Sequence, residues 1–406
     1  MRIAKQDDRA LVIATIADMP FAGAHERDCA RAFTLVARGA ARSRAEIGEQ
    51  LGLRSTTTSR VVGDLVARRL VLESAGEKAG RGRPAGLLTA NSRRIGASVL
   101  HVASRSLAGA LVDLNGQVIE QRFAEIAPDA DNAVIAKAMA ALASGLADAM
   151  PRGMEHAGTA VSLSGLLDLK QKTWLMSSRW PSMRGLDVQS VLAPITPPVE
   201  VCRNLDAELR ARAMQRPAEH AGGALLLHWG WGVGLAYAVD GQSFAPAGGS
   251  FGEIGHWRFQ TLAGRACGCG NTACLETGAA LWALMPRLRQ DWPELSEDEA
   301  ALQAQLPDCD LMSLAEIDTA ARLVARALAN VCRLLFPARI TVTGPLVANA
   351  RLWAHFDALF RAEGVMQGMA MPQLGNDRAS QHYEIYGAAQ PLLSRAVERA
   401  LSATRG

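Results

Sequence analysis

Residues 252–278 read GEIGHWRFQTLAGRACGCGNTACLETG and contain one histidine and three cysteines within a short span. These residues are His256, Cys267, Cys269 and Cys274, with the spacing H-x10-C-x-C-x4-C. Imidazole nitrogens and thiolate sulfurs are the ligands that tetrahedral zinc takes in a closed structural site. The spacing therefore predicts that this segment folds around one structural Zn2+ ion per chain.

An alternative interpretation is that the cysteines are small buried residues and that His256 is a histidine of the core. The remaining cysteines are scattered over the chain, at Cys29, Cys202, Cys309 and Cys332. The clustering of the other three therefore favours a metal site. An odd number of cysteines, with three committed to a metal, also favours a reducing compartment, and we expect a cytoplasmic protein.

The segment resembles the zinc-bearing signature of the ROK family, which contains sugar kinases and sugar-responsive transcriptional repressors. The resemblance rests on GEIGH followed by C-x-C-G-x3-C-L-E and extends over nearly the whole chain. Ala273 stands where the family has a glycine. The resemblance implies an α/β protein in which an N-terminal winged helix-turn-helix precedes a two-lobed, actin-like (ROK sugar-kinase) fold with a ligand cleft between the lobes.

The length of 406 residues suits two or three domains, each with its own core. We expect a DNA-binding head at residues 1–90. The first α/β lobe should comprise residues 91–203 together with a C-terminal helix at about 386–406. Residues 204–385 should form the second lobe, which would carry the zinc site and the dimer contacts.

The net charge of +3 is distributed unevenly. Residues 1–94 contain 17 Lys or Arg and 10 Asp or Glu, a net charge of +7, which leaves −4 for the rest. A basic head on a mildly acidic body predicts a polyanionic partner for the head alone. The uncharged run at residues 221–239 contains five glycines, which favours buried strands over a membrane helix. The charged N-terminus also lacks the pattern of a signal peptide, so we expect no membrane association.

Residues 43–66 have the pattern of a helix-turn-helix. Ser43 lies three residues before Glu46, which is typical of a helix N-terminus, and Gly52 indicates a tight turn before a second helix. The N-terminal part of that second helix enters the major groove in such motifs. The residues expected to contact DNA there are Arg54, Ser55, Thr56, Thr57, Thr58 and Arg60. The alternative is a solvated amphipathic helix of some other domain.

A basic segment, Arg81-Gly82-Arg83-Pro84, follows an expected wing strand at residues 70–72 and resembles an AT-hook core. Two Arg side chains on a flat backbone can enter a narrow minor groove, where the negative potential is enhanced. We therefore expect Arg81 and Arg83 to bind DNA; a basic linker is the alternative. Residues 1–25 are expected to add one helix.

The body, from about residue 91 onward, alternates expected strands and helices, as a two-lobed α/β fold requires. Strands are expected near residues 98–102, 107–112, 117–122, 159–163, 199–202, 225–228 and 339–343, and helices near 133–150, 313–335 and 388–402, with another from about 206.

Three segments that family kinases use for phosphate binding and catalysis have changed. HVASR at residues 101–105 replaces a D-x-G-G-T loop, and GWGVG at residues 230–234 replaces a G-T-G-x-G segment. Asn204 stands where the kinases have a catalytic Asp, and an amide cannot deprotonate a sugar hydroxyl. These losses predict that the chain is not an enzyme. A sugar kinase with a DNA-binding extension is the alternative.

The resemblance also implies a sugar site. The expected effector-binding residues are Gly165, Arg203, Asn204, Glu253, His256 and Glu276. Carboxylates accept hydroxyl protons, which gives the directional recognition that sugars need. Arg203 replaces an Asn of the family and would suit an acidic or phosphorylated sugar. The alternative is that Glu253 and Glu276 lie at the surface or only support the metal site.

Together these features predict a ROK-family transcriptional regulator of carbohydrate genes, expected to be a repressor. It should bind double-stranded DNA at an inverted repeat as a homodimer or tetramer. A sugar or sugar derivative that closes the cleft would shift the population away from the DNA-competent arrangement of two heads. A regulator that no longer senses a sugar is a second alternative.

Replacing Arg81 and Arg83 by alanine should weaken DNA binding mainly on sites with A·T-rich minor grooves beside the half-sites. Binding should also fall steeply with salt, because Lys and Arg contacts release counterions from DNA. Electrophoretic mobility shifts on matched A·T-rich and G·C-rich duplexes measure both effects. Equal losses on the two duplexes would show that the minor-groove interpretation is wrong.

Overall fold

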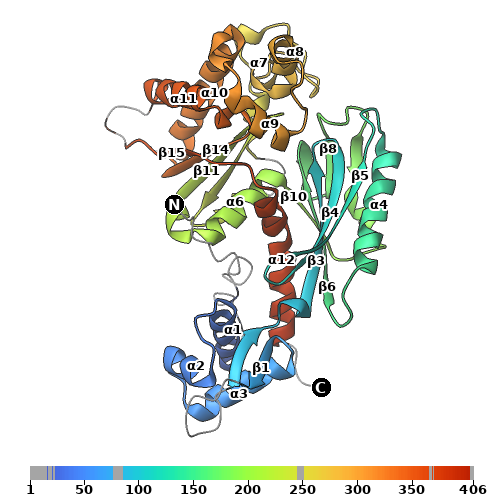
Figure 1. Cartoon of the computed structure of the whole chain (residues 1–406), viewed down its shortest axis with the longest axis vertical. Coiled ribbons are helices and arrows are strands. Elements are labelled where there is room, and N and C mark those ends of the chain that lie inside the picture. Colours follow the sequence, from blue (N-terminus) through green and yellow to red (C-terminus); the bar gives the residue numbers. More distant parts are fainter. Residues whose placement is uncertain are drawn as a thin grey trace.

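The computed structural model describes residues 16, 21, 23–75, 86–244, 251–364, 368 and 370–402. Figure 1 shows a small helical part at one end of the molecule and two larger lobes, each with a sheet, at the other. The predicted minor-groove residues Arg81 and Arg83 lie outside the described residues, as does nearly all of the helix expected within residues 1–25. None of the helices in the described ranges combines the length and apolar character needed to cross a bilayer.

Within its described residues, the N-terminal part contains three α-helices and a two-stranded antiparallel sheet. Its elements are α1 (Ala24–Ala37), α2 (Arg44–Leu51), α3 (Ser55–Ala67), β1 (Val71–Ala75) and β2 (Gly86–Ala90). Helix α2 begins as predicted, because the Ser43 side chain accepts a hydrogen bond from the Glu46 N–H at 3.3 Å. The helix ends at Gly52, whose φ of 65° lies in the left-handed region that favours glycine. The chain therefore reverses within a few residues, and α3 packs against α1 and α2.

The first lobe is built on a five-stranded sheet with the order β10-β6-β3-β4-β5. Its strands are β3 (Ile95–Ala103), β4 (Ser106–Asp113), β5 (Val118–Glu125), β6 (Glu155–Leu163) and β10 (Val199–Arg203). Helix α4 (Asn132–Asp148) covers one face and α12 (Gln381–Ser402) the other. A small sheet of β7 (Leu166–Asp168), β8 (Thr173–Met176) and β9 (Arg184–Asp187) precedes α5 (Val188–Leu192).

The second lobe repeats this topology, with the strand order β13-β12-β11-β14-β15. In both sheets three antiparallel strands, consecutive in the chain, are extended by two parallel strands. The strands are β11 (Gly223–Trp229), β12 (Val233–Val239), β13 (Gln242–Ser243), β14 (Arg339–Thr343) and β15 (Gln373–Asn376). The helices are α6 (Asn204–Gln215), α7 (Glu276–Ala279), α8 (Leu281–Asp291), α9 (Glu299–Gln305), α10 (Ala315–Leu335) and α11 (Ala350–Glu363).

Short 3-10 turns connect these elements. They are η3 (Ser92–Arg94), η4 (Pro217–His220), η5 (Ile254–His256), η6 (Gln260–Leu262), η7 (Leu306–Asp308), η8 (Leu311–Ser313) and η9 (Leu346–Ala348). Two of them, η5 and η6, lie in the cysteine-rich segment, which otherwise contains only isolated bridges and turns before α7. The segment therefore has little regular secondary structure, and individual backbone hydrogen bonds between its loops, such as those from Phe259 N–H to the Ala273 carbonyl oxygen and from Cys267 N–H to the Asn271 carbonyl oxygen, help to order it.

The C-terminal helix differs most from its prediction, because α12 begins at Gln381 rather than near residue 388. Its first turns are polar and carry no apolar stripe, so the sequence pattern does not mark them. They are helical because they pack against α6. A Cβ atom on Gly387 would lie 1.7 Å from the carbonyl oxygen of Ala207, so only glycine permits this approach.

Helix α12 also joins the first lobe to the N-terminal part of the chain. The Arg68 side chain, just after α3, donates a hydrogen bond of 2.5 Å to the carbonyl oxygen of Ala400. Leu393 and Val397 of α12 belong to the same buried apolar cluster as Phe33 of α1 and residues of β3. The N-terminal part and the first lobe therefore share one continuous core along α12 (Figure 1).

Replacing Leu393 by alanine should lower the free energy of unfolding by about 2–5 kcal/mol, because the residue is fully buried and leaves a cavity. Chemical denaturation followed by circular dichroism measures this loss. The matched control is Leu334→Ala, whose side chain is 73% exposed and which should change stability by less than about 0.5 kcal/mol. Equal effects of the two substitutions would contradict a shared core at α12.

Candidate functional site

His256, Cys267, Cys269 and Cys274 come together in the structure. The Nδ1 of His256 lies 3.6 Å from the Sγ of Cys267, and the Sγ atoms of Cys269 and Cys274 are 3.7 Å apart. All four ligand atoms lie within 4.8 Å of one another. With bonds of about 2.3 Å to sulfur and about 2.0 Å to nitrogen, a tetrahedral zinc site has edges of about 3.5–3.8 Å. The cluster therefore has the donor set and the spacing to hold a metal ion.

A cleft of about 240 Å³ lies beside this cluster, between the two lobes. The structure places all six predicted effector residues in its lining: Gly165, Arg203, Asn204, Glu253, His256 and Glu276. They come from the end of β6, the junction of β10 with α6, and the two ends of the cysteine-rich segment. Gly165 has a φ of 95°, and a Cβ atom there would lie 2.2 Å from the Met176 carbonyl oxygen. Glycine is therefore required at this edge of the cleft.

Arg203 is already engaged by protein groups. Its guanidinium lies 3.3 Å from Glu253 and 3.5 Å from Asp206, and it donates two hydrogen bonds to the Leu235 carbonyl oxygen. Burial raises the pKa of Glu253, and the charge of Arg203 partly offsets that effect. The expectation that Arg203 suits an acidic or phosphorylated sugar is therefore not supported. Its role in this structure is to hold Glu253 at the cleft.

Glu276 lines the cleft from the same lobe as Glu253. One carboxylate oxygen accepts a hydrogen bond of 2.9 Å from the Val233 N–H, and the other accepts one of 3.3 Å from the Trp282 indole. A Cβ atom on Gly255 would lie 2.8 Å from the Glu276 side chain, so the GEIGH segment and α7 pack closely together. The carboxylate is thus fixed in place at the N-terminus of α7, with its remaining lone pairs available to a ligand.

Side chains of the two lobes contact each other at the end of the cleft that contains the altered phosphate segments. Ser104 donates a hydrogen bond of 2.5 Å to Asp298, and Arg105 pairs with Glu297 at 2.5 Å. Both contacts run from the β3–β4 turn of the first lobe to the segment before α9 in the second. His101 is buried on β3, and burial lowers its pKa to about 4, so it is neutral and offers no charge to a phosphate.

Glu299 and Arg179 continue this inter-lobe contact. Arg179 lies 3.9 Å from Glu299 and stacks over the Trp231 ring at 4.1 Å. Glu299 accepts a hydrogen bond of 2.5 Å from the Trp231 N–H and pairs with His228 at 3.0 Å. Burial acts to raise the pKa of Glu299, but these partners outweigh it and lower the pKa to about 2. Glu299 and Arg179 therefore contact GWGVG, the segment that aligns with G-T-G-x-G of the kinases, through Trp231.

Sequence analysis missed Glu384, which also lines the cleft. It lies in the first turn of α12 and accepts a hydrogen bond of 2.7 Å from Ser162 at the end of β6. Burial raises its pKa to about 8, so the side chain is mostly protonated at neutral pH. No local pattern marks Glu384 or the network around Glu299, because the partners come from segments far apart in the chain.

Comparison with known proteins identifies the family. A model described as the ROK family matches residues 100–390. The chain belongs to the ROK family. The predicted family membership is therefore confirmed, and the two-lobed body is the ROK sugar-kinase type of fold.

Curated ROK relatives of similar length are regulators. The xylose repressor of Bacillus spizizenii is 24% identical over 341 residues, which cover 82% of this chain and 85% of the repressor. The transcriptional dual regulator NagC of Escherichia coli is 23% identical over 331 residues, with 75% and 77% covered. A glucokinase of Halalkalibacterium halodurans matches only 133 residues, 30% of this chain, at 29% identity.

Solved ROK structures support the fold. A ROK family transcriptional regulator, a homologue of the Escherichia coli Mlc protein, matches with a TM-score of 0.71 at 20% identity, over 93% of this chain and 98% of that one. A ROK family glucokinase from Streptomyces griseus matches with a TM-score of 0.59 at 18% identity, over 72% of this chain and 98% of that one. At these identities the likeness shows the fold alone.

The one departure from the ROK cysteine pattern has a structural account. Ala273 has a φ of 63°, the left-handed region in which glycine is favoured. For alanine this conformation costs roughly 1–2 kcal/mol. Hydrogen bonds between Ala273 and the backbone of Phe259 and Arg265, 2.8 and 2.9 Å long, hold it there. The cluster therefore forms with alanine at this position.

The predicted DNA-facing residues do not all face solvent. Arg54, Ser55, Thr56 and Arg60 are exposed, and Thr57 is half-buried. Thr58 is only 3% exposed, and its hydroxyl donates to the Arg54 carbonyl oxygen at 3.2 Å. The prediction was wrong for Thr58, because it packs towards α2 in the crossing of the two helices.

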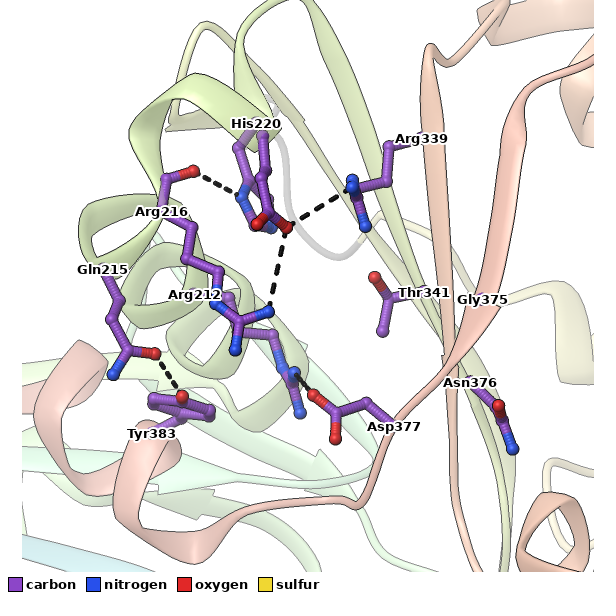
Figure 2. Close-up of a pocket in the computed structure, with 11 residues that line it drawn as sticks. Arg212, Gln215, Arg216, His220, Arg339, Thr341, Gly375, Asn376, Asp377 and Tyr383 are labelled. Carbon is purple, nitrogen blue, oxygen red and sulfur yellow. Dashed lines mark hydrogen bonds and ion pairs between the residues drawn. The ribbon is translucent and has the colours of Figure 1, made fainter. Parts of the chain in front are cut away.

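A second hollow, of about 100 Å³, lies on the second lobe and contains none of the predicted residues. Figure 2 shows Arg212, Arg216 and Arg339 converging on it. Arg212 pairs with Asp377 at 2.7 Å, while Arg216 and Arg339 approach Glu219 at 3.7 and 3.3 Å. Ion pairs between protein groups therefore line this hollow and connect α6 with β14 and the end of β15. We do not take it as the candidate effector site.

Replacing Cys269 by serine should remove one zinc ion per chain and destabilise the second lobe, because the binding energy of a structural metal is largely folding energy. Elemental analysis of protein purified without chelator, together with a thermal melt, measures both. Cys309→Ser, a buried cysteine of the same lobe outside the cluster, is the control and should keep the metal. Wild-type protein without bound zinc would contradict the prediction.

Proposed function

We propose that this ROK-family chain is a DNA-binding transcriptional repressor of carbohydrate genes that senses a sugar in the cleft between its lobes and does not catalyse phosphoryl transfer. The observation that carries the proposal is the difference between the two ends of the cleft. The end beside the cysteine cluster presents the expected hydroxyl-binding carboxylates, whereas at the expected phosphate end acidic side chains and contacts between the lobes line the cleft. Related repressors of similar length favour the same function.

The N-terminal part supports DNA binding as a winged helix-turn-helix. Helix α2, the turn at Gly52 and helix α3 have the order of that motif, and the β1–β2 pair follows where a wing belongs. Arg54 and Arg60 are exposed near the N-terminus of α3, where they can reach a phosphate backbone or base edges. Two such heads in a homodimer would match an inverted repeat.

Zinc is the ion that best suits the cysteine cluster, given its three thiols and one imidazole. His256 faces the cluster through Nδ1 and also lines the cleft. When bound, the ion would fix the imidazole and the two ends of the segment that carry Glu253 and Glu276. The metal would therefore have a structural role, supporting one wall of the sugar site.

The lining of the cleft favours an uncharged sugar over a phosphorylated or acidic one. Its acidic residues other than the mostly protonated Glu384 are Glu208, Glu253, Glu276, Asp298 and Glu299, against the basic residues Arg179 and Arg203. Both arginines already lie beside carboxylates, Arg179 near Glu299 and Arg203 near Glu253. An added anion would meet net negative potential in a partly desolvated site. Hydroxyl groups can instead donate to these carboxylates.

Helix α12 is the proposed connection between the cleft and the DNA-binding head. Glu384 in its first turn lines the cleft, and Ala400 near its last turn accepts the hydrogen bond from Arg68 behind α3. A ligand that changes the position of α12 would therefore change the orientation of α3 relative to the two lobes. In a dimer this would alter the spacing of two recognition helices and so the population that fits the operator.

Replacing Glu253 by alanine should abolish the effect of the sugar on DNA binding while leaving the affinity for DNA without sugar nearly unchanged. Loss of a charge-assisted hydrogen bond costs about 1.5–3 kcal/mol, which is roughly a ten- to a hundredfold loss in sugar affinity. Titration of an operator complex with a panel of neutral sugars measures this. Glu253→Gln keeps the shape of the side chain and should show a smaller loss.

The control for this experiment is Glu125→Ala, an exposed glutamate on β5 away from the cleft, which should respond as wild type. An unchanged sugar response in Glu253→Ala would place the effector elsewhere. Sugar-dependent ATP turnover by the wild-type protein would overturn the proposal that the cleft is not catalytic.

A further inference from the structure

A second cluster of metal-ligating side chains lies in the N-terminal part of the chain. His25 and Cys29 are one helical turn apart on α1, and Asp64 lies opposite them on α3. The Nε2 of His25 is 2.5 Å from the Oδ2 of Asp64 and 3.6 Å from the Sγ of Cys29. Within the described residues, this group and the cysteine cluster of the second lobe are the two sets whose ligand atoms all lie within 4.8 Å of one another.

The arrangement brings three electron-pair donors to one point. A single ring nitrogen, Nε2 of His25, faces both the thiol and the carboxylate. The 2.5 Å between Nε2 and Oδ2 is a hydrogen-bond distance, shorter than the edge of about 3.3 Å between two ligands of one zinc ion, so a bound ion would move Asp64 away from the ring. The Cys29 sulfur lies 3.6 Å from the same nitrogen, which equals the separation between His256 and Cys267 and is close to an edge of a tetrahedral zinc site.

We propose that His25, Cys29 and Asp64 bind a second divalent transition-metal ion, of the zinc class, between α1 and α3. Imidazole, thiolate and carboxylate together suit Zn2+ better than Mg2+ or Ca2+, which prefer oxygen ligands alone. The His25 side chain is 29% exposed, so water can reach the site and fill the fourth position. This makes it an open site, unlike the four-ligand cluster of the second lobe.

Metal binding would change the state of the Cys29 thiol. The thiol is buried between the helices. On binding, the sulfur gives a lone pair to the ion and the thiol proton leaves to solvent, so zinc uptake should release protons.

The site would cross-link the first helix of the head to the helix proposed to read DNA. Asp64 lies on α3, one turn after Arg60, which is exposed on the same helix. Occupation would hold α3 against α1 and favour one orientation of the recognition surface. This consequence for DNA rests on the proposed function, whereas metal binding itself does not.

The structural alternative is that the His25–Asp64 hydrogen bond links the two helices without a metal ion, beside their apolar packing. The two possibilities differ in what Cys29 does. A hydrogen-bonded tether leaves the number of bound ions independent of Cys29, whereas a metal site requires the sulfur. Zinc content therefore separates them without any DNA measurement.

The test is the zinc stoichiometry of the full chain, loaded with Zn2+, dialysed into zinc-free buffer without chelator and measured by elemental analysis. Wild type should hold two ions per chain, Cys29→Ser one and Cys269→Ser one. Cys332→Ser, a buried cysteine outside both clusters, should hold two. Asp64→Asn keeps the shape and a hydrogen-bonding atom but removes the anionic ligand, and it should weaken the second ion by about tenfold or more.

Co2+ provides an independent readout, because thiolate-to-cobalt absorption reports each sulfur bound to the metal. This absorption should decrease in Cys29→Ser and remain unchanged in Cys332→Ser. One zinc ion per wild-type chain, or equal stoichiometry in wild type, Cys29→Ser and Asp64→Asn, would overturn the proposal. Circular dichroism shows whether each variant is folded, and Asp64→Asn supplies the result if Cys29→Ser is not. Loss of zinc with unchanged operator binding would refute only the coupling to DNA.

Discussion

The close contact between α12 and α6 at Gly387 is the constraint on which the arrangement of the molecule depends. A side chain at this position would overlap the Ala207 carbonyl oxygen, so the two helices meet backbone to backbone. Helix α6 begins at Asn204 in the cleft, and α12 begins beside it and ends at the head. Tightly packed interiors transmit displacements because they have no free volume to absorb them. The cleft and the head are therefore linked through one packed pair of helices.

Charged groups of both lobes contact each other at the end of the cleft formed by the β3–β4 turn and the start of α9. Glu299, His228 and Arg179 form a buried network there, and Ser104 and Arg105 add contacts from the other lobe. Buried ions carry a large desolvation penalty unless each has partners. Removing any one of these residues would leave a desolvated charge without its partner. The complete network therefore stabilises the contact between the lobes. It connects the two lobes at this end of the cleft.

The cysteine-rich segment has little regular secondary structure, although backbone hydrogen bonds connect its loops. Two isolated bridges and two 3-10 turns order it before α7 begins. A segment with so little regular structure needs another source of stability, and the four convergent ligand atoms have the spacing to provide it through a metal ion. Glu253 and Glu276 stand at the two ends of this segment, so its folding determines how far apart these carboxylates lie.

The sequence by itself indicated the family, the main strands and helices of the body and the candidate metal ligands, but not β7–β9, β15 or helices α5, α7–α9 and α11. The features it indicated depend on neighbouring residues. Ser43 before Glu46, Gly52 at the turn and three cysteines within eight residues act over distances that a short pattern records. It also indicated that six residues belong to one site, and the structure places them around one cleft. Their metal-binding and sugar-binding roles remain predictions.

Only the tertiary structure decided how those residues are used. It showed that Arg203 holds Glu253 rather than standing free, that Thr58 is buried, and that α12 begins seven residues before its apolar stripe. It also brought Glu384 and Glu299 into the cleft, and His25 and Cys29 to Asp64. The physical reason is common to all of these cases. Each depends on the approach of segments distant in the chain, where packing and desolvation override local propensity, and no short pattern encodes such a meeting.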